Sequence, residues 1–512
     1  MRKKLLSIPF IAWLYQQGFV HMAYLWLIDR IDDLSRLIEA HRPGPRKQVT
    51  SFDYWQWVRE LANTVSQTLT SANIDHIIFD AKQPIIAVPA DSRPKALEII
   101  AKSARPLYFV ELENGLPKAA KPAKHRPAGD SLVLTEYLIA PDRTPITDMS
   151  MGVRLDFWTQ AENWTSPVVN ETAETLTNEQ WKAAQATHRF PSAFFKVTEP
   201  IDIVYSWVDG GDPEWQAKKA AVMGVPFTPD ANQTGRYVEH DELKYSLRSI
   251  KMFASWVRHV YVVSDCKPPA WLNTDDDFIT WMDFPEFFAD PSVLPVFNSH
   301  AIEAQLQNIP GLSEQYLYLN DDFLFGRPVE PEVFFTGNGK IKLAFSRAVI
   351  DPEPVLADDI GATAGSKNAR KIVYELTGKM YSNKLRHAPY GQLKSVMREL
   401  EERIPDTIAR IAASKLRSPQ DIAITSSMAP YYAYCTGRAV TGDAKTWTFD
   451  LTVPDAIHQL RVRLRQRAVD TICVNTADVS GFKDGKKRDD ALHEFFERMY
   501  PVAGPWERQG IE

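Results

Sequence analysis

The feature that most constrains the fold is an apolar run that ends in two adjacent aspartates. Residues 316–319 are all aromatic or aliphatic, and Asn320, Asp321 and Asp322 follow directly. Such a run is typical of a buried strand, and carboxylates at its end are costly unless something pairs with them. The carboxyl ends of the strands in an open α/β sheet form a ligand crevice, so these three side chains are expected at its floor. The alternative is a turn in which Asn and Asp satisfy only local hydrogen bonds.

Two other apolar runs end in the same way. Residues 201–208 precede Asp209, and residues 260–264 precede Asp265. Helical patterns lie between these strands, and this alternation predicts right-handed crossovers in a mostly parallel sheet. Asp209, Asp265 and Asp321 are therefore expected to face one crevice. The Gly210-Gly211 pair suits a tight turn there, but it is neither a Walker A motif nor a dinucleotide fingerprint.

The length of 512 residues predicts two or three units. Residues 1–198 read as helices followed by a small α/β domain, and residues 199–512 as the catalytic domain. Within the latter, residues 340–465 are expected to be a mainly helical insertion. The predicted fold class is α/β, with a mostly parallel central sheet of the Rossmann or GT-A type.

Charge and cysteine content limit the partners and the compartment. A formal net charge of −6 gives no general footprint for nucleic acid. No apolar segment reaches the roughly 20 residues needed to span a bilayer, and the basic start before an apolar run lacks a clear signal cleavage site. The three distant cysteines read as buried thiols. These points predict a cytoplasmic enzyme, with peripheral contact to the inner membrane face through amphipathic first helices left open.

Cationic candidates complete a set that suits phosphate chemistry. His387 and Arg417 each stand before a predicted helix start, where backbone N–H groups also favour anions. A helix over residues 241–250 places Glu242 and Arg248 on neighbouring faces. Carboxylates hold hard cations such as Mg²⁺ or Mn²⁺, and guanidinium groups hold phosphate oxygens. The residues alone therefore point to nucleotide-diphosphate chemistry.

Three blocks of the chain closely resemble the Stealth family, which includes bacterial capsule and exopolysaccharide phosphotransferases and the animal N-acetylglucosamine-1-phosphotransferase. They are residues 201–215, 241–260 and 309–326. The resemblance extends to residues 386–400 and, more loosely, 471–507. It departs at Asn475-Thr476, where relatives tend to have Asn-Asp.

The resemblance implies transfer of a sugar 1-phosphate from a nucleotide-diphosphate sugar, such as UDP-N-acetylglucosamine, to a hydroxyl of a polysaccharide or lipid-linked glycan. A nucleoside monophosphate would leave. A glycosyltransferase on the same donor is the alternative, and it would release a nucleoside diphosphate. A catalytically idle sugar-binding scaffold is disfavoured because it has no need of buried acids.

Each candidate residue has an expected role. Asp321 and Asp322 share the metal and the general-base tasks, with Asp322 slightly favoured as the base because alternate strand residues diverge. His387 is expected to stabilise or protonate the phosphate, and Arg417 to bind the diphosphate. The expected substrate-binding residues are Asp209, Gly210, Glu242, Arg248 and Asn320.

Overall fold

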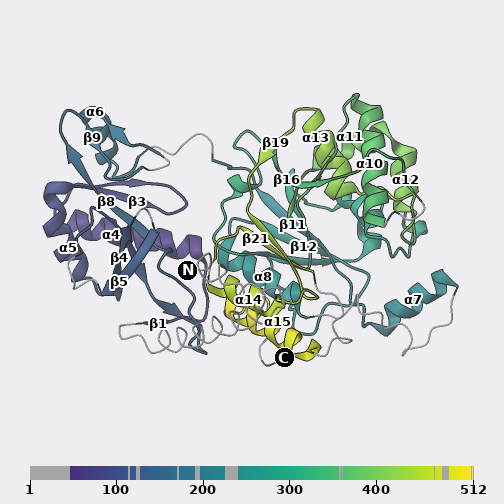
Figure 1. Ribbon diagram of the computed structural model, residues 1–512, viewed down its shortest axis with the longest axis horizontal. Coiled ribbons are helices and arrows are strands. Elements are labelled where there is room, and N and C mark those ends of the chain that lie inside the picture. Colours follow the sequence, from purple (N-terminus) through teal and green to yellow (C-terminus); the bar gives the residue numbers. More distant parts are fainter. Residues whose placement is uncertain are drawn as a thin grey trace, which may run out of the picture.

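The computed structural model describes most of the chain beyond residue 45. The expected first helices lie outside the described residues. So does Thr476, the residue at which the sequence departs from the Asn-Asp of its relatives. No described helix is long and apolar enough to cross a membrane. Figure 1 shows an N-terminal unit, coloured purple to blue, beside a larger unit that holds the rest of the chain. The described residues are 46–113, 116–122, 127–169, 172–190, 196–224, 240–356, 359, 361–465, 467–475, 484–508 and 510.

The N-terminal unit is built on an eight-stranded sheet. Its main path runs β10-β9-β8-β6-β4-β5, and β3 joins β8 in parallel while pairing with β2. The short strands and the helix expected between residues 74 and 113 are present. The strands are β2 (Ile77–Phe79), β3 (Ile85–Pro89), β4 (Leu107–Glu113), β5 (Leu116–Pro122), β6 (Ser131–Glu136), β8 (Val153–Gln160), β9 (Trp164–Thr165) and β10 (Thr175–Leu176). The helices are α4 (Tyr54–Ser71), α5 (Arg93–Ala101) and α6 (Asn178–Gln185), and β1 (Lys47–Gln48) pairs with β7 (Leu138–Ile139).

The larger unit is organised around a five-stranded sheet in the order β13-β12-β11-β14-β18. The first four strands are parallel, and β18 joins the edge antiparallel to β14. The predicted mostly parallel α/β sheet is therefore confirmed. Its strands are almost wholly buried, as expected when helices cover a parallel sheet. The strands are β11 (Ile201–Ser206), β12 (His259–Val263), β13 (Ile279–Met282), β14 (Gln315–Asn320) and β18 (Tyr390–Leu393).

Helices and two small sheets surround this central sheet (Figure 1). Residues 340–465 contain helices, as expected, but also five strands, of which β18 belongs to the central sheet. This stretch is thus not simply a helical insertion. The helices are α7 (Pro213–Met223), α8 (Glu242–Phe253), α9 (Ser299–Glu303), α10 (Gly361–Thr377), α11 (Lys394–Arg403), α12 (Pro405–Ala412), α13 (Ala429–Cys435), α14 (Ala456–Arg465) and α15 (Gly485–Met499). The small sheets are β15 (Phe323–Phe325), β21 (Thr471–Asn475) and β20 (Thr446–Asp450), and β17 (Asn383–Leu385), β16 (Ile341–Val349) and β19 (Ala439–Gly442).

The two units share one continuous hydrophobic core, which includes residues from Phe52 to Trp506. Helix α4 makes the junction. The indole nitrogen of Trp55 donates to the carbonyl of Phe253 at 2.9 Å, and Asp53, the N-cap of α4, accepts from the Ser255 hydroxyl at 2.7 Å. The N-terminal unit is therefore packed onto the catalytic unit.

Candidate active site

The register of the central sheet brings the three strand-end aspartates to one edge. Ser206, the last residue of β11, is paired with Val263 of β12 on one side and with Asn320 of β14 on the other. Asp209, Asp265 and Asp321 follow these strand ends within three residues. The predicted crevice at the carboxyl end of the parallel strands is therefore where the chain places its acids.

Asp321 and Asp322 form the turn between β14 and β15. The backbone N–H of Asp322 donates to Oδ1 of Asp321 at 3.1 Å, as in the local-turn alternative. Helix α8 fixes the chain that follows. The Ser246 hydroxyl binds the carbonyl of Phe323, and the Ser249 hydroxyl accepts from the N–H of Phe325 at 2.9 Å. The turn is thus anchored by side chains from another element and does more than reverse the chain.

Burial and mutual repulsion keep the two carboxyl groups from ionising easily. Burial raises the pKa of Asp321 well above its usual value, and the charges of Asp322 and Glu242 raise it further. Burial also raises the pKa of Asp322 to about 7, with Glu242 adding to the rise and a hydrogen bond from Cys473 opposing it. Carboxyl groups whose pKa values are strongly perturbed are frequent at active sites.

Glu242, at the start of α8, is the third member of this acidic group. Burial alone would raise its pKa, but His240 lowers it, through hydrogen bonds and its charge. The backbone N–H of His240 donates to Oε2 of Glu242 at 2.6 Å. Glu242 is therefore an ionised neighbour of the aspartates, consistent with its expected place at the crevice.

The donor atoms fit a hard divalent cation. Oδ1 of Asp322 is buried and has no hydrogen-bond partner among the described residues. Such an atom lacks the compensation that a buried carboxylate needs, and a cation held by Asp321 and Asp322 would supply it. Oxygen ligands of this kind suit Mg²⁺ or Mn²⁺.

A second donor set shares Asp322. Ligand atoms of Asp322, His387 and Cys473 lie within 4.8 Å of one another. Burial and the nearby Asp322 raise the pKa of the Cys473 thiol strongly, so the thiol holds its proton. The contacts that join these three side chains in the structure are hydrogen bonds.

The chain of contacts runs from His387 through Cys473 to Asp322. Nδ1 of His387 lies 3.1 Å from Sγ of Cys473, and that thiol donates to Oδ2 of Asp322 at 3.4 Å. The rings of His387 and Phe323 pack edge-on, with 4.7 Å between their centres. Burial of the imidazole lowers the pKa of His387. The sequence marked Cys473 only as a buried thiol, because no local signal shows which face of β21 meets the acids.

The expected helix start after His387 is wrong. His387 precedes strand β18, and α11 begins only at Lys394. An anion-binding helix N-terminus is therefore not part of this site. His387 approaches Asp322 because β18 pairs with β14, which ends at the acid pair.

Arg417 also does not precede a helix in the way expected. Ser418 binds Asp421 within a loop, and the next helical segment is a π-helical turn over Ile424–Met428. Arg417 is exposed and donates to Ser299 at 2.7 Å. Burial raises the pKa of Tyr318, while the charge of Arg417 opposes that rise. The Tyr318 hydroxyl bonds Ser206 at 2.7 Å, so Tyr318 joins β14 to the end of β11.

The loop after β11 is a tight turn capped by its own acids. Oδ1 of Asp209 accepts from the N–H of Gly211 at 2.7 Å, and Asp212 caps α7. A Cβ on Gly211 would lie 3.1 Å from Oδ1 of Asp209, a close contact. Gly210 is buried and its carbonyl accepts from Gln216. Asp209 and Gly210 therefore lie in the loop that follows β11, and the half-buried Asn320 is the last residue of β14. Their place at a substrate crevice stays a prediction.

Arg248 is not with these residues. Its guanidinium forms a bidentate ion pair with Glu507, at 2.7 Å and 2.6 Å, and also donates to the carbonyl of Tyr500. Six residues along a helix correspond to about 240° of rotation, so Glu242 and Arg248 point to different surroundings. Arg248 was expected to line the substrate crevice. In the structure it holds the C-terminal segment through Glu507 and Tyr500.

Three family models match the chain. Conserved region 1 of Stealth proteins matches residues 199–224, region 2 matches residues 236–343, and region 3 matches residues 386–434. These matches contain Asp209, both aspartates of the turn, His387 and Arg417. The expected last block, residues 471–507, lies outside the three matches.

Curated relatives carry a functional name. The chain is 33% identical over 458 residues to Exopolysaccharide phosphotransferase SCO6021 of Streptomyces coelicolor, which covers 83% of this chain and 84% of the relative. It is 44% identical over 311 residues to Exopolysaccharide phosphotransferase SCO6023 of the same organism, covering 60% of this chain but only 53% of that relative.

Among solved structures, the galactosyltransferase LgtC overlaps 59% of this chain and 96% of its own, at 13% identity and a TM-score of 0.29. A score of that size does not establish a common fold.

Proposed function

The chain belongs to the Stealth family, and from this premise we propose that it transfers a sugar 1-phosphate from a nucleotide-diphosphate sugar to a glycan hydroxyl. The acceptor oxygen attacks the β-phosphorus and forms a phosphodiester. The bond from that phosphorus to the bridging oxygen breaks, and a nucleoside monophosphate leaves. The acceptor proton must go to a base of the enzyme. The observation that supports this chemistry best is the half-buried acid pair at the carboxyl end of β14.

The different surroundings of the two aspartates suggest different tasks. Burial and the neighbouring charges of Asp322 and Glu242 raise the pKa of Asp321 well above its usual value, so its carboxylate needs a positive counter-charge and would hold Mg²⁺ or Mn²⁺ together with an oxygen of Asp322. The cation, when bound, neutralises charge on the diphosphate. Asp322, with a pKa of about 7, is matched to proton transfer at neutral pH and serves as the general base.

Cys473 couples His387 to this base. A thiol has one proton, and it goes to Oδ2 of an ionised Asp322. The neutral His387 must then donate Nδ1–H to the sulfur, which leaves Nε2 as a proton acceptor on the exposed side of the ring. If Asp322 gains a proton, the sulfur can donate to Nδ1 instead and Nε2 carries a hydrogen. Nε2 can then donate to a phosphate oxygen. Cys473 is a positioning residue in this scheme.

The remaining residues hold the donor. Arg417 presents an exposed planar guanidinium beside the strand ends, a group that can bind two phosphate oxygens at once. Asp209, Gly210 and Asn320 border the nucleotide at the same edge. Glu242 keeps the acid pair at a raised pKa and lines the crevice. Arg248 is left out of the donor site.

The identity of the released nucleotide tests the reaction. The purified chain is incubated with UDP-N-acetylglucosamine and other nucleotide sugars, Mg²⁺ and a glycan acceptor, and products are separated by chromatography. Release of the monophosphate with a new phosphodiester signal in ³¹P NMR supports the proposal. Release of the diphosphate would identify a glycosyltransferase, and tight donor binding without turnover would identify a scaffold.

Removal of the cation tests the role of the acid pair. EDTA is expected to abolish turnover, and Mg²⁺ or Mn²⁺ to restore it. Full activity in EDTA would contradict the assignment of Asp321 as a cation ligand.

The compartment is also a proposal. The three free thiols suit a reducing cytoplasm, where nucleotide sugars would serve as donors for glycans assembled at the inner membrane face. Fractionation of cells that express the natural protein tests this, and recovery only outside the cell would refute it.

A further inference from the structure

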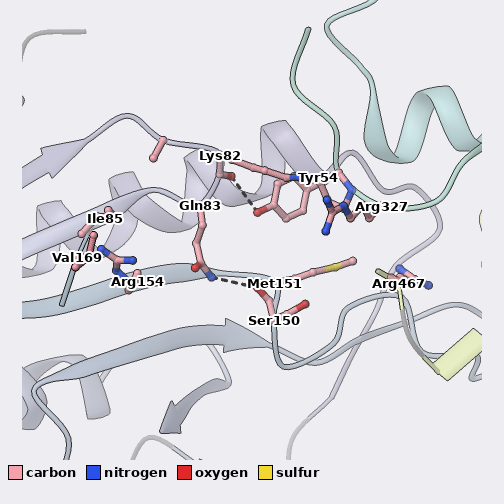
Figure 2. A pocket seen from close by; sticks show the side chains of 12 residues that line it. Tyr54, Lys82, Gln83, Ile85, Ser150, Met151, Arg154, Val169, Arg327 and Arg467 are labelled. Carbon is pink, nitrogen blue, oxygen red and sulfur yellow. Dashed lines mark hydrogen bonds between the residues drawn. The ribbon is translucent and has the colours of Figure 1, made fainter. Parts of the chain in front are cut away.

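A cavity of about 520 Å³ lies where the N-terminal unit meets the catalytic unit (Figure 2). This volume is within the range of sites that hold small molecules, about 300–1,000 Å³. Neither aspartate of the acid pair lines it. Polar groups reach it from both units, and the ones used below are Tyr54, Lys82, Gln83, Arg154, Arg327 and Arg467.

The lining is strongly cationic in an acidic protein. Four of the twelve lining residues are Lys or Arg and none is Asp or Glu, although the chain has 65 acidic and 59 basic residues. Two carboxylates stand behind the wall. Asp156 pairs with Arg154 at 2.9 Å, and Asp470 pairs with Arg327 at 2.7 Å. These pairs fix two guanidinium groups at the wall, and the charges of Asp148 and Glu330 also act nearby, on Arg467 and Tyr54.

Arg467 adds a cation that no carboxylate pairs within the described part of the chain. It donates to the carbonyl of Ile146 at 3.0 Å, and its guanidinium lies over the Phe253 ring at 5.4 Å. Burial lowers its pKa, and the charge of Asp148 only partly offsets this. Arg467 is half-buried, and a cation that is partly removed from water and has no ion pair is stabilised by an anionic ligand. Nη2 of Arg154 is buried. It lies 2.9 Å from Oδ2 of Asp156, but the angles at that contact are not those of a hydrogen bond.

The cavity is connected to the acid pair by a strand pair. In the β15–β21 ladder Phe323 faces Cys473 and Phe325 faces Thr471, so the acids lie at one end. The ion pair of Arg327 and Asp470 lies just beyond the other end. At roughly 3.3 Å per residue, Asp322 and Arg327 are on the order of 15 Å apart along the chain.

We propose that this cavity binds a phosphodiester group of the acceptor glycan, at a unit that already carries the linkage which the enzyme forms. This inference rests on the proposed function. Guanidinium groups match phosphate oxygens in planar, two-point geometry. Gln83 and Tyr54 also line the cavity. The Gln83 amide donates to the carbonyl of Ser150 at 3.1 Å, and the Tyr54 hydroxyl donates to the carbonyl of Lys82 at 3.3 Å (Figure 2). The enzyme thus favours acceptors that are already phosphodiester-linked.

A binding measurement with defined probes tests the cavity itself. The full chain is titrated by calorimetry, without donor, with a phosphodiester-linked disaccharide and with the same disaccharide joined by a neutral glycosidic bond. The combined variant Lys82→Gln and Arg467→Gln is expected to bind the phosphodiester on the order of tenfold more weakly or worse. Rising salt should weaken binding to the wild-type chain, because salt screens charge.

Arg463→Gln is the matched control. Arg463 lies on α14, four residues before Arg467, with its guanidinium 4.8 Å from the centre of the Trp447 ring and outside the cavity. Its variant should bind the phosphodiester like the wild type. Lys82→Glu alone, which leaves Arg467 in place, keeps the test available if the combined variant fails to fold. Equal affinity in wild-type and cavity variants, or equal binding of the neutral disaccharide, overturns the proposal.

Kinetics separate this inference from the reaction assignment. In the cavity variants, KM for the phosphodiester acceptor should rise while KM for the nucleotide sugar stays unchanged. A rise in the donor KM instead would assign the cavity to the donor and overturn the inference. Binding to phosphatidylglycerol vesicles is measured for the same variants. If the cavity variants lose binding to these vesicles as well as to the phosphodiester disaccharide, the inference is also overturned. It is also possible that no acceptor yields a nucleoside monophosphate while the cavity variants still bind the phosphodiester disaccharide more weakly than the wild type. In that case the reaction assignment fails and phosphodiester binding stands.

Discussion

At the scale of single residues, the acid pair and His387 carry the chemistry. Asp321→Asn, Asp322→Asn and His387→Ala are each expected to lower turnover by about 10²- to 10⁴-fold, the usual range for losing a general acid or base or an electrostatic contact. Turnover is measured as nucleoside monophosphate release, with circular dichroism to check folding. Glu214→Gln is the matched control, because Glu214 is an exposed carboxylate paired only with Lys267. Near wild-type turnover in both Asp322→Asn and His387→Ala would refute the assignment.

Cys473 gives a prediction with a specific pH signature. Asp322 works as a base only when ionised, so kcat/KM should rise with pH as Asp322 ionises. A cation bound at the acid pair lowers the pKa of Asp322 from its cation-free value of about 7. The hydrogen bond from Cys473 lowers that pKa, so Cys473→Ala should shift the rising limb to higher pH. Cys473→Ser retains a donor and should shift it less. A lower kcat with an unchanged limb in the Ala variant would reduce Cys473 to a packing residue.

At the scale of elements, helix α8 has two functions on two faces. Its Ser246 and Ser249 bind the chain that follows the acid turn, whereas Arg248 binds Glu507 after α15. Both side chains of this ion pair are largely buried, at 13% and 7% exposure. Removing one partner of such a pair leaves an uncompensated charge. Arg248→Gln should therefore lower the free energy of unfolding by about 3 kcal/mol and leave kcat/KM unchanged.

Urea unfolding and steady-state kinetics test this assignment. Glu507→Gln should cost a similar amount, and the double variant should cost less than the sum because the two residues contact each other. A fall in kcat/KM for Arg248→Gln, with stability unchanged, would return Arg248 to the substrate site.

At the scale of the whole molecule, the shared core predicts one cooperative transition. The N-terminal and catalytic units bury apolar residues in the same cluster, and α4 joins them through Trp55. Thermal unfolding followed by circular dichroism and by tryptophan fluorescence should give coincident curves. Two separated transitions, or a stable fragment released by proteolysis near residue 198, would show that the units fold independently.

The sequence by itself determined the local elements and the place of the main acids. Apolar runs and helical spacing depend on neighbouring residues, so they predicted the strands of the parallel sheet, and the strand-end rule placed Asp209, Asp321 and Asp322 at one edge. Only the tertiary structure decided which distant residues contact one another. Cys473 meets Asp322 across 151 residues, and Arg248 meets Glu507 across 259. Likewise, His387 precedes an edge strand instead of a helix because β18 pairs with β14. The cationic cavity arises only where two units pack. Such contacts depend on how distant elements dock, and no local pattern encodes that docking.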